Sequence, residues 1–591
     1  MMRKRCVIHG KAVHPEIAMK LQKTCLILLS LALGAHFAYA KKKPKYEVTH
    51  PLTPAQSALV DKSIAREKVI IRNIQQHTPL VETYIQDTRP DPKLYQVPIS
   101  DTYMLSRVDF HKTFLDKPYE APVKKTHGFF KGSLAAFTNI GKALHLDQET
   151  YNTQGFMDMM FVDPIGYDRQ HYEFNYVRRE FLGSVRTVVF DVHPKVKGQG
   201  RFNGRIWVED QDGNIVRFNG SYTESTSEDN TREYFHFDSW RMNLQPNLWL
   251  PAAIYVEESQ RIEGNKSVGL RAQTHFWGYS LTLPTRDSDN VSVEVEGAVD
   301  QSQDSQDVTP LEASRLWVQQ AENNVLDRLQ QAGLLAPPSD FDKTLEQIII
   351  NLEVPNNLNF PDPVHARILL TTTVEATTVG NTILLSKGLI DTLPNEESIA
   401  AVVSMELAHV ALGHHIDTRY AFNDRLLFPD ESSFQRIKMN HSDQDNTDAA
   451  KVAVKYLQAS MYKDRLGNAG LYMEQLVERG KVLKQLNTPK LGDSLLKDDG
   501  TPWMAALEQG APKLNQDDMT QIAAFPLGSW LKTDPWDDTE HMLNAKRYAP
   551  MNARDKMPFE VTPIYFRLRR YEAATAPAAN PSPANPAPAA Q

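Results

Sequence analysis

The residues with the clearest chemical potential lie between positions 404 and 415. Glu406 and His409 stand three residues apart in an apolar stretch that follows Asn395 and two acidic residues. Asn395 predicts an N-cap, and acids after a cap are typical of a first helical turn. In the zinc-binding pattern H-E-x-x-H, two histidines on one helix face bind the metal and the glutamate polarises the metal-bound water. Here Met405 occupies the first histidine position, so Glu406 and His409 alone match the pattern.

This helix resembles the zinc helix of the HtpX- and BepA-like gluzincin metallopeptidases (peptidase family M-48), which carries H-E-L-A-H-V-x-x-G-H. Residues 380–390 resemble the edge strand and turn that border the family's substrate cleft, and the resemblance extends over roughly residues 340–550. It implies a peptidase-like fold. An extended peptide can add to an exposed sheet edge. The resemblance therefore makes the strand residues Thr382, Ile383, Leu384 and Leu385 a candidate peptide-binding edge.

The resemblance also locates the other members of the family's site. The family takes its third zinc ligand from the glutamate of an E-x-x-x-D motif on a later helix, and the aspartate supports that ligand. Alignment on Tyr462 places Asn446 and Ala450 at these two positions, whereas alignment on Asp448 places Gln444 at the glutamate. Neither alignment supplies a glutamate.

A further histidine of the family's site is also replaced. Asp534 stands where the family often has the histidine of Thr-His-Pro. A catalytic zinc ion needs three protein ligands and a water molecule. The sequence therefore predicts a pseudopeptidase without a tightly bound cofactor. In that prediction Glu406 is a remnant general base and His409 a remnant ligand. Met405 and Asn446 are degenerate ligand positions, and Ala450 and Asp534 are degenerate supporting positions.

Three alternatives stay open at this point. A rebuilt zinc site could combine His409 with other nearby residues, namely His414, His415, His441, Asp443, Asp445 and Asp448. Met405 and His409 together could bind Cu(I), because thioethers suit soft metals. Met405 could also simply pack in a core. If Glu406 is buried without a cation, we expect its pKa to rise, because burial disfavours the charged form.

The middle of the chain predicts an antiparallel sheet or half-barrel. Residues 172–177 and 185–192 alternate between apolar and polar types, and Asp212, Gly213 and Asn214 mark a hairpin. This part resembles the LolA-like periplasmic lipoprotein-carrier β-domains over about 100 residues, at 181–183, 189–192, 204–210, Gly213 and Arg217. A concave apolar face here would favour a carrier of an acyl chain or peptide. A sheet with a packed interior would be a plain scaffold.

The N-terminus predicts export from a bacterial cytoplasm. Two lysines precede the apolar run from Cys25 to Leu33, and Ala38-Tyr39-Ala40 completes a signal-peptide pattern whose start could be Met19. The 591-residue chain has only two cysteines and a net charge of −8, which gives no basic surface for nucleic acid. We expect a periplasmic or secreted protein with no stable transmembrane segment after cleavage.

These observations predict an α+β, multidomain chain. The expected parts are a signal peptide (1–40), an N-terminal helical segment (41–125), the antiparallel β-domain (126–283), an acidic linker (284–310), a mainly helical M-48-like domain with a small edge sheet (311–572) and a disordered Ala/Pro tail (573–591). Three functions compete. The first is a pseudopeptidase that binds an extended polypeptide or an envelope protein. The second is an active zinc endopeptidase with an unorthodox ligand set. The third is a carrier that holds a hydrophobic ligand in the β-domain.

Overall fold

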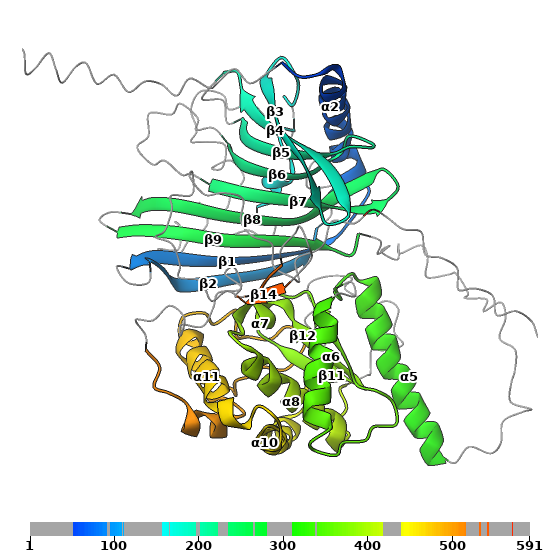
Figure 1. Ribbon diagram of the computed structural model, residues 1–591, viewed down its shortest axis with the longest axis vertical. Helices are drawn as coiled ribbons and strands as arrows, with labels where there is room; N and C mark the ends of the chain where they lie inside the picture. Colours follow the sequence, from blue (N-terminus) through cyan, green and yellow to red (C-terminus); the bar gives the residue numbers. More distant parts are fainter. Residues whose placement is uncertain are drawn as a thin grey trace, which may run out of the picture. The chain divides into compact units, whose positions relative to one another are not determined.

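The computed structural model describes two kinds of architecture in one chain, a large antiparallel sheet and a mainly helical part (Figure 1). The described residues are 51–91, 95–108, 110, 156–164, 166–196, 201–222, 235–263, 266–279, 310–336, 340–417, 439–515, 531–533, 540–542 and 570. The predicted α+β class is confirmed. The predicted signal peptide, the tail and all of the linker except Pro310 lie outside the described residues. None of the described helices is long and apolar enough to cross a membrane.

The large sheet contains nine strands, all antiparallel to their neighbours, in the order β2-β1-β9-β8-β7-β6-β5-β4-β3. The sheet is open, because β2 and β3 are its two edges and do not pair with each other. The strands are β1 (Leu80–Asp91), β2 (Tyr95–Arg107), β3 (Tyr172–Leu182), β4 (Val185–Pro194), β5 (Phe202–Glu209), β6 (Ile215–Tyr222), β7 (Phe235–Gln245), β8 (Leu248–Glu263) and β9 (Lys266–Trp277).

The sheet begins earlier in the chain than predicted. β1 and β2 fall inside the expected helical segment 41–125, yet β1 pairs with β9 in a register that places Leu80 opposite Trp277. The boundary at residue 126 is therefore wrong as the limit of the β-domain. The cause is a pairing between strands almost 200 residues apart in the sequence, which no local pattern reveals.

The hairpin predicted at Gly213 is confirmed. Gly213 has a φ of +77°, which favours glycine, and it lies between the paired strands β5 and β6. A Cβ atom placed there would lie 2.6 Å from Cβ of Lys62. Glycine is thus required both by the turn and by the close approach of the helix that carries Lys62.

That helix is α2 (Pro54–Ile74), within the segment predicted to be helical. The Thr53 side chain accepts from the Gln56 N–H, and the Gln56 side chain accepts from the Thr53 N–H, which forms a capping box. One side of α2 packs with the 3-10 turn η1 (Met157–Met160) into the apolar cluster on one face of the sheet. The strand residues of this cluster are mostly aromatic or branched, such as Phe190, Phe218 and Ile254.

The helical part surrounds a sheet of three short strands. Its main helices are α5 (Pro310–Gln331), α6 (Asp340–Glu353), α7 (Lys387–Thr392), α8 (Glu396–Leu412), α10 (Asp443–Ala459) and α11 (Leu466–Gly480). The strands are β10 (His365–Leu369), β11 (Ala376–Val379) and β12 (Thr382–Ser386), in the order β10-β12-β11. Two further short strands, β13 (Leu531–Thr533) and β14 (Glu540–Met542), pair with each other.

The predicted edge strand is not at an edge. β12 lies in the middle of the small sheet, parallel to β10 on one side and antiparallel to β11 on the other. The prediction that Thr382, Ile383, Leu384 and Leu385 form a peptide-binding edge is therefore wrong. Gly380, which has a φ of +59°, lies in the turn that joins β11 to β12. No peptide can add to a strand whose two sides are already paired.

Candidate functional site

The helix that carries the H-E-x-x-H remnant forms as the sequence predicts. In α8 the Asn395 side chain accepts from the Ser398 N–H, and the helix ends at Gly413, which has a φ of +68°. Nearly every residue of α8 up to His409 is buried. Glu406 and His409 are consequently held away from solvent.

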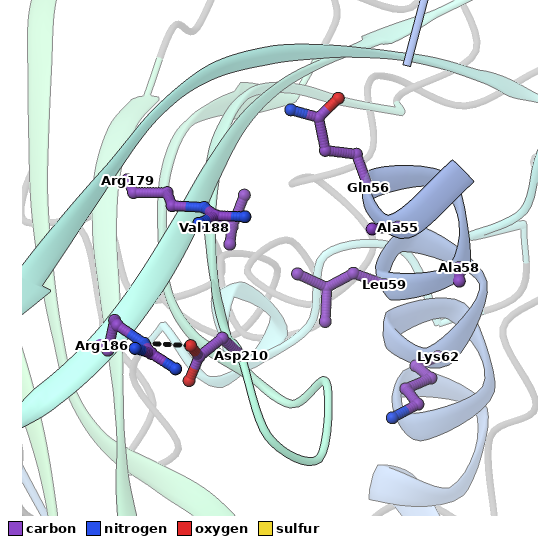
Figure 2. Close-up of a pocket in the computed structure, with 9 residues that line it drawn as sticks. All are labelled: Ala55, Gln56, Ala58, Leu59, Lys62, Arg179, Arg186, Val188 and Asp210. Atoms are coloured by element: carbon purple, nitrogen blue, oxygen red, sulfur yellow. Dashed lines mark hydrogen bonds and ion pairs between the residues drawn. The ribbon is translucent and has the colours of Figure 1, made fainter. Parts of the chain in front are cut away.

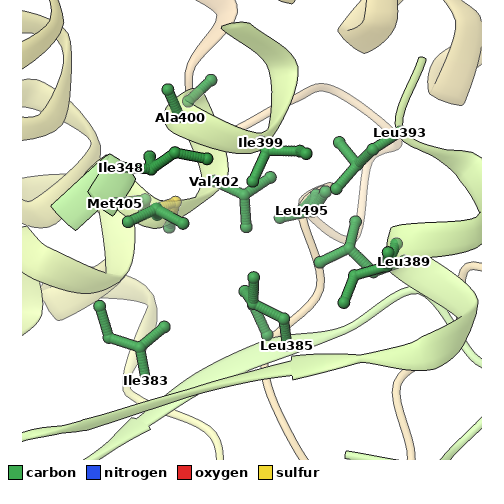
Figure 3. Close-up of a cluster of buried hydrophobic side chains, with 14 of the residues drawn as sticks. Ile348, Ile383, Leu385, Leu389, Leu393, Ile399, Ala400, Val402, Met405 and Leu495 are labelled. Carbon is green, nitrogen blue, oxygen red and sulfur yellow. The ribbon is translucent and has the colours of Figure 1, made fainter. Parts of the chain in front are cut away.

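Met405 belongs to the apolar core of the helical part. Figure 3 shows its side chain among Ile348, Ile383 and Leu385, in a cluster of buried hydrophobic residues. It is 1% exposed. The structure therefore gives Met405 the packing role that the sequence argument left open.

The polar groups near His409 form a second, separate set, which we call the histidine cluster: His409, His414, His441, Asn446 and Asp493. The Nδ1 atoms of His409 and His414 are 3.0 Å apart, and the rings of His409 and His441 stack with centroids 3.9 Å apart. Nδ1 of His441 lies 2.7 Å from Oδ2 of Asp493, and the Asn446 amide donates to Oδ1 of the same carboxylate at 2.9 Å. The cluster thus joins α8 and α10 to the loop that contains Asp493.

The structure distinguishes between the two alignments of the family's third ligand. Asn446 lies on the buried side of α10 and donates to Asp493 of the histidine cluster, whereas Gln444 donates to Asp448 at an exposed position. Ala450 is buried one turn after Asn446. Of the two aligned positions, Asn446 therefore belongs to the histidine cluster and Gln444 does not.

Several candidates for a rebuilt metal site lie elsewhere. His415 contacts Glu322 of α5 at 2.8 Å, and Asp448 pairs with Lys451. Asp445 comes within 3.6 Å of His414 but caps its own helix through Ser442. The predicted position Asp534 lies outside the described residues.

Burial controls the electrostatics of this region. Burial raises the pKa of Glu406 to about 8, with a further contribution from the Asp493 charge, although His441 and the 2.8 Å hydrogen bond from Thr378 oppose the rise. This agrees with the expectation for a glutamate buried without a cation. Burial, followed by His441 and His414, lowers the pKa of His409 to about 3. For His441, burial works to lower the pKa, but the hydrogen bond and charge of Asp493 outweigh it and raise the pKa.

In this arrangement the residues do not fit a catalytic zinc ion. Within the described ranges, no group of three or more His, Cys, Asp or Glu side chains is placed to hold a metal. Nε2 of His409, Nε2 of His441 and Oδ1 of Asn446 are buried without a hydrogen-bond partner in the described structure. Two of these atoms belong to histidines, but the third is a neutral amide oxygen in place of the carboxylate that a catalytic zinc site of this type uses.

We therefore expect purified protein, dialysed against trace zinc, to retain far less than about one zinc ion per chain. Elemental analysis measures this directly. Retention of about one ion per chain that resists a chelator would instead mean that the histidine cluster rearranges into a rebuilt site.

A second feature, on the large sheet, is a cavity. A cavity of about 280 Å³ lies between the first turns of α2 and strands β3 and β4 (Figure 2). Leu59 projects into it from the helix and Val188 lies opposite on the sheet. The complete lining is Ala55, Gln56, Ala58, Leu59, Lys62, Arg179, Arg186, Val188 and Asp210.

The cavity adjoins the apolar cluster between α2 and the sheet. Val188 belongs to that cluster, and Leu59 packs against it. Deeper in the cluster the aromatic rings contact one another, as with Phe202 and Phe218, whose centroids are 5.7 Å apart. The aromatic interior of this cluster is thus packed, and the cavity lies at its margin beside the start of α2.

Sequence reasoning missed both Asp493 and this cavity. Nothing in the sequence near Asp493 marks it as the partner of a histidine 52 residues away. Alternation over 185–192 does predict that Val188 faces a core, but it carries no information about which helix packs there. The cavity could not be predicted because the sequence does not show that α2 packs on this sheet.

Comparisons with known proteins assign no family to the chain. No family model matches the sequence, and no curated protein matches it. Among solved structures, a LolA superfamily protein from Nitrosomonas europaea matches with 12% identity and a TM-score of 0.17, covering 39% of this chain and 97% of that chain. A likeness this low carries no argument about fold or function. None of the comparisons supports the resemblance to peptidase family M-48.

Proposed function

We propose that this protein is a binding protein or carrier for an elongated hydrophobic molecule, which it holds in the cavity between α2 and strands β3 and β4. The observation that carries the proposal is the cavity itself, which has an apolar wall formed by Leu59 and Val188 and opens beside a large apolar cluster. On the export pattern of the sequence, we place this activity in the bacterial envelope.

The size of the cavity favours a single chain. Small-molecule sites range from about 300 to 1,000 Å³, so a volume of about 280 Å³ lies just below this range. One alkyl chain is narrow enough for such a space, whereas a two-chain lipid requires more. The three methionines of η1, which belong to the same cluster, add flexible side chains that can repack around a guest.

The histidine cluster does not supply a better function. An active zinc endopeptidase needs a ligand set that these residues do not provide. The pseudopeptidase prediction used β12 as the free peptide-binding edge, and β12 is paired on both sides. The edge strand β11 is bridged at Ala376 to Asp493. Hydrophobic-ligand binding is therefore the function that the described geometry supports best.

The proposal predicts a dependence of affinity on chain length. Burial of one methylene contributes about 0.8 kcal/mol, so affinity for straight-chain alcohols is expected to rise about fourfold per carbon from hexanol to decanol. The measurement is displacement of an environment-sensitive fluorescent probe from the full chain. Affinity that is independent of chain length would contradict binding in an apolar cavity.

A substitution in the cavity wall tests the location. Leu59→Asn keeps a similar size but places an amide in the apolar wall, and we expect decanol affinity to fall by about tenfold or more. Ala65→Asn is the matched control, because Ala65 lies on the same helix at an exposed position that does not line the cavity. Equal affinities for the two variants would place any ligand somewhere other than beside α2.

A further inference from the structure

The entrance of the cavity is positively charged although the chain as a whole is acidic. Of the nine lining residues, Lys62, Arg179 and Arg186 carry positive charges and Asp210 alone carries a negative charge. The complete chain has a net charge of −8. A local excess of cations beside an apolar wall is the arrangement that suits an amphiphile with a negatively charged head.

Two of the three cations already have partners. Arg186 donates from Nε to Asp210, and the Lys62 ammonium lies 3.4 Å from the backbone oxygen of Gln211. The first of these is a full ion pair, so Asp210 neutralises much of the Arg186 charge. The third cation, Arg179, is the one that can pair with an anionic ligand.

Arg179 has no hydrogen-bond or ion-pair partner among the described residues. Its neighbour Arg178, in contrast, forms an ion pair with Glu180. In Figure 2 the Arg179 side chain extends from the sheet toward Gln56 and Leu59 of α2. An exposed guanidinium directed across a cavity entrance can form two parallel hydrogen bonds to a carboxylate.

The start of α2 adds to the positive field. The helix has 21 residues and no acidic residue in its first turn, so the positive end of its dipole is not neutralised locally. Ala55 and Gln56 of that turn line the cavity together with Arg179. The positive end of α2 and the Arg179 guanidinium therefore both attract a negative charge in this cavity.

We propose that the ligand is a single-chain amphiphile with an anionic head, a long-chain carboxylate, whose alkyl chain lies against Leu59 and Val188 and whose head pairs with Arg179. This inference rests on the proposed function, because it specifies the ligand of the same cavity. Asp210 then acts against binding, since it competes for Arg186 and repels the head.

The test compares three ligands with the same ten-carbon chain: decanoate, decanol and decyltrimethylammonium. Each is titrated into the full chain by calorimetry at fixed ionic strength, with the two ionic ligands below their critical micelle concentrations and decanol below its solubility limit. We expect decanoate to bind at least about tenfold more tightly than decanol, and the ammonium ligand to bind most weakly.

Substitutions then show which residues cause the preference for a negatively charged ligand. Arg179→Gln is expected to reduce the ratio of decanoate to decanol affinity to near one, with little change for decanol. Asp210→Asn is expected to tighten decanoate binding, because it frees Arg186. Arg72→Gln is the matched control, since it removes a guanidinium from the exposed opposite end of α2 and should change no ratio.

The outcomes separate the two proposals. If all three ligands bind equally, or if Arg179→Gln behaves like Arg72→Gln, the proposed anionic head group is wrong. The proposed binding of a hydrophobic molecule in the cavity is then unaffected. If none of the three ligands binds to the wild-type chain, the proposed function fails and this inference fails with it. A preference for decanoate that Arg179→Gln removes supports both.

Discussion

Replacement of Glu67 by alanine is expected to lower the free energy of unfolding by about 3–5 kcal/mol, the cost of removing one partner from a buried ion pair. Glu67 lies on α2, and its carboxylate accepts two hydrogen bonds from the Arg241 guanidinium of β7, at 2.7 and 2.8 Å. Both side chains are at most 3% exposed. Without Glu67, Arg241 is left as a charged group in an apolar cluster.

The pair also connects four elements at one point. Arg241 donates to the backbone oxygens of Ile215 on β6 and Met160 on η1, both at 3.1 Å. The Val162 N–H donates to Glu67 at 3.4 Å. Loss of the carboxylate therefore loosens both α2 and η1 on the sheet.

Asp61→Ala is a control that differs mainly in burial. Asp61 lies on the same helix and pairs with Arg169 at 2.6 Å, but the two side chains are 60% and 40% exposed. Exposed pairs contribute about 0–1 kcal/mol. Urea unfolding of the two variants gives the comparison. Equal losses of stability would show that burial is not what makes the Glu67 pair important.

The same pair marks the limit of what the sequence can reveal. The start of α2 was predictable because its capping signal, Thr53 and Gln56, lies within one turn. Glu67 and Arg241 are 174 residues apart, and each looks like an ordinary surface charge in its own segment. Their partnership depends on how α2 packs, and local patterns contain no such information.

The sheet shows the same distinction between local and distant signals. Alternation and the Gly213 turn predicted strands and a hairpin, because both depend on neighbours in the sequence. The membership of β1 and β2 in that sheet depends on pairing with β9 and was missed. In the helical part, the sequence predicted a strand at Thr382–Ser386 but not its central position, since an edge is a property of the whole sheet.

At the histidine cluster, the alignment on Tyr462 paired Asn446 with His409, 37 positions away. The structure connects Asn446 to the cluster through its hydrogen bond to Asp493, which also accepts from His441, whose ring stacks on His409. The alignment offered no place for Asp493. The carboxylate that organises the cluster therefore comes from outside the predicted motif.

Glu406→Gln is expected to stabilise the protein increasingly as the pH rises. In the folded chain the pKa of Glu406 is raised from an ordinary 4.5 to about 8, mainly by burial. The protonated form therefore stabilises the fold fully below pH 4.5, and this contribution is lost as the pH rises through about 8. A difference of this size corresponds to on the order of 5 kcal/mol at pH 9. Glutamine remains neutral at every pH and can still accept the hydrogen bond from Thr378.

The measurement is the difference in unfolding free energy between variant and wild type at pH 5, 7 and 9. The Glu406 charge also raises the pKa of His441, so the measured difference contains the change at that histidine as well. Glu396→Gln, on the exposed first turn of the same helix, removes the same charge without burial and should show no such trend. If the gain in unfolding free energy from Glu406→Gln does not grow with pH, the folded protein does not keep the Glu406 carboxyl protonated. Chelator-sensitive cleavage of casein that Glu406→Gln abolishes would restore the peptidase interpretation, because a general base has to be ionised to act.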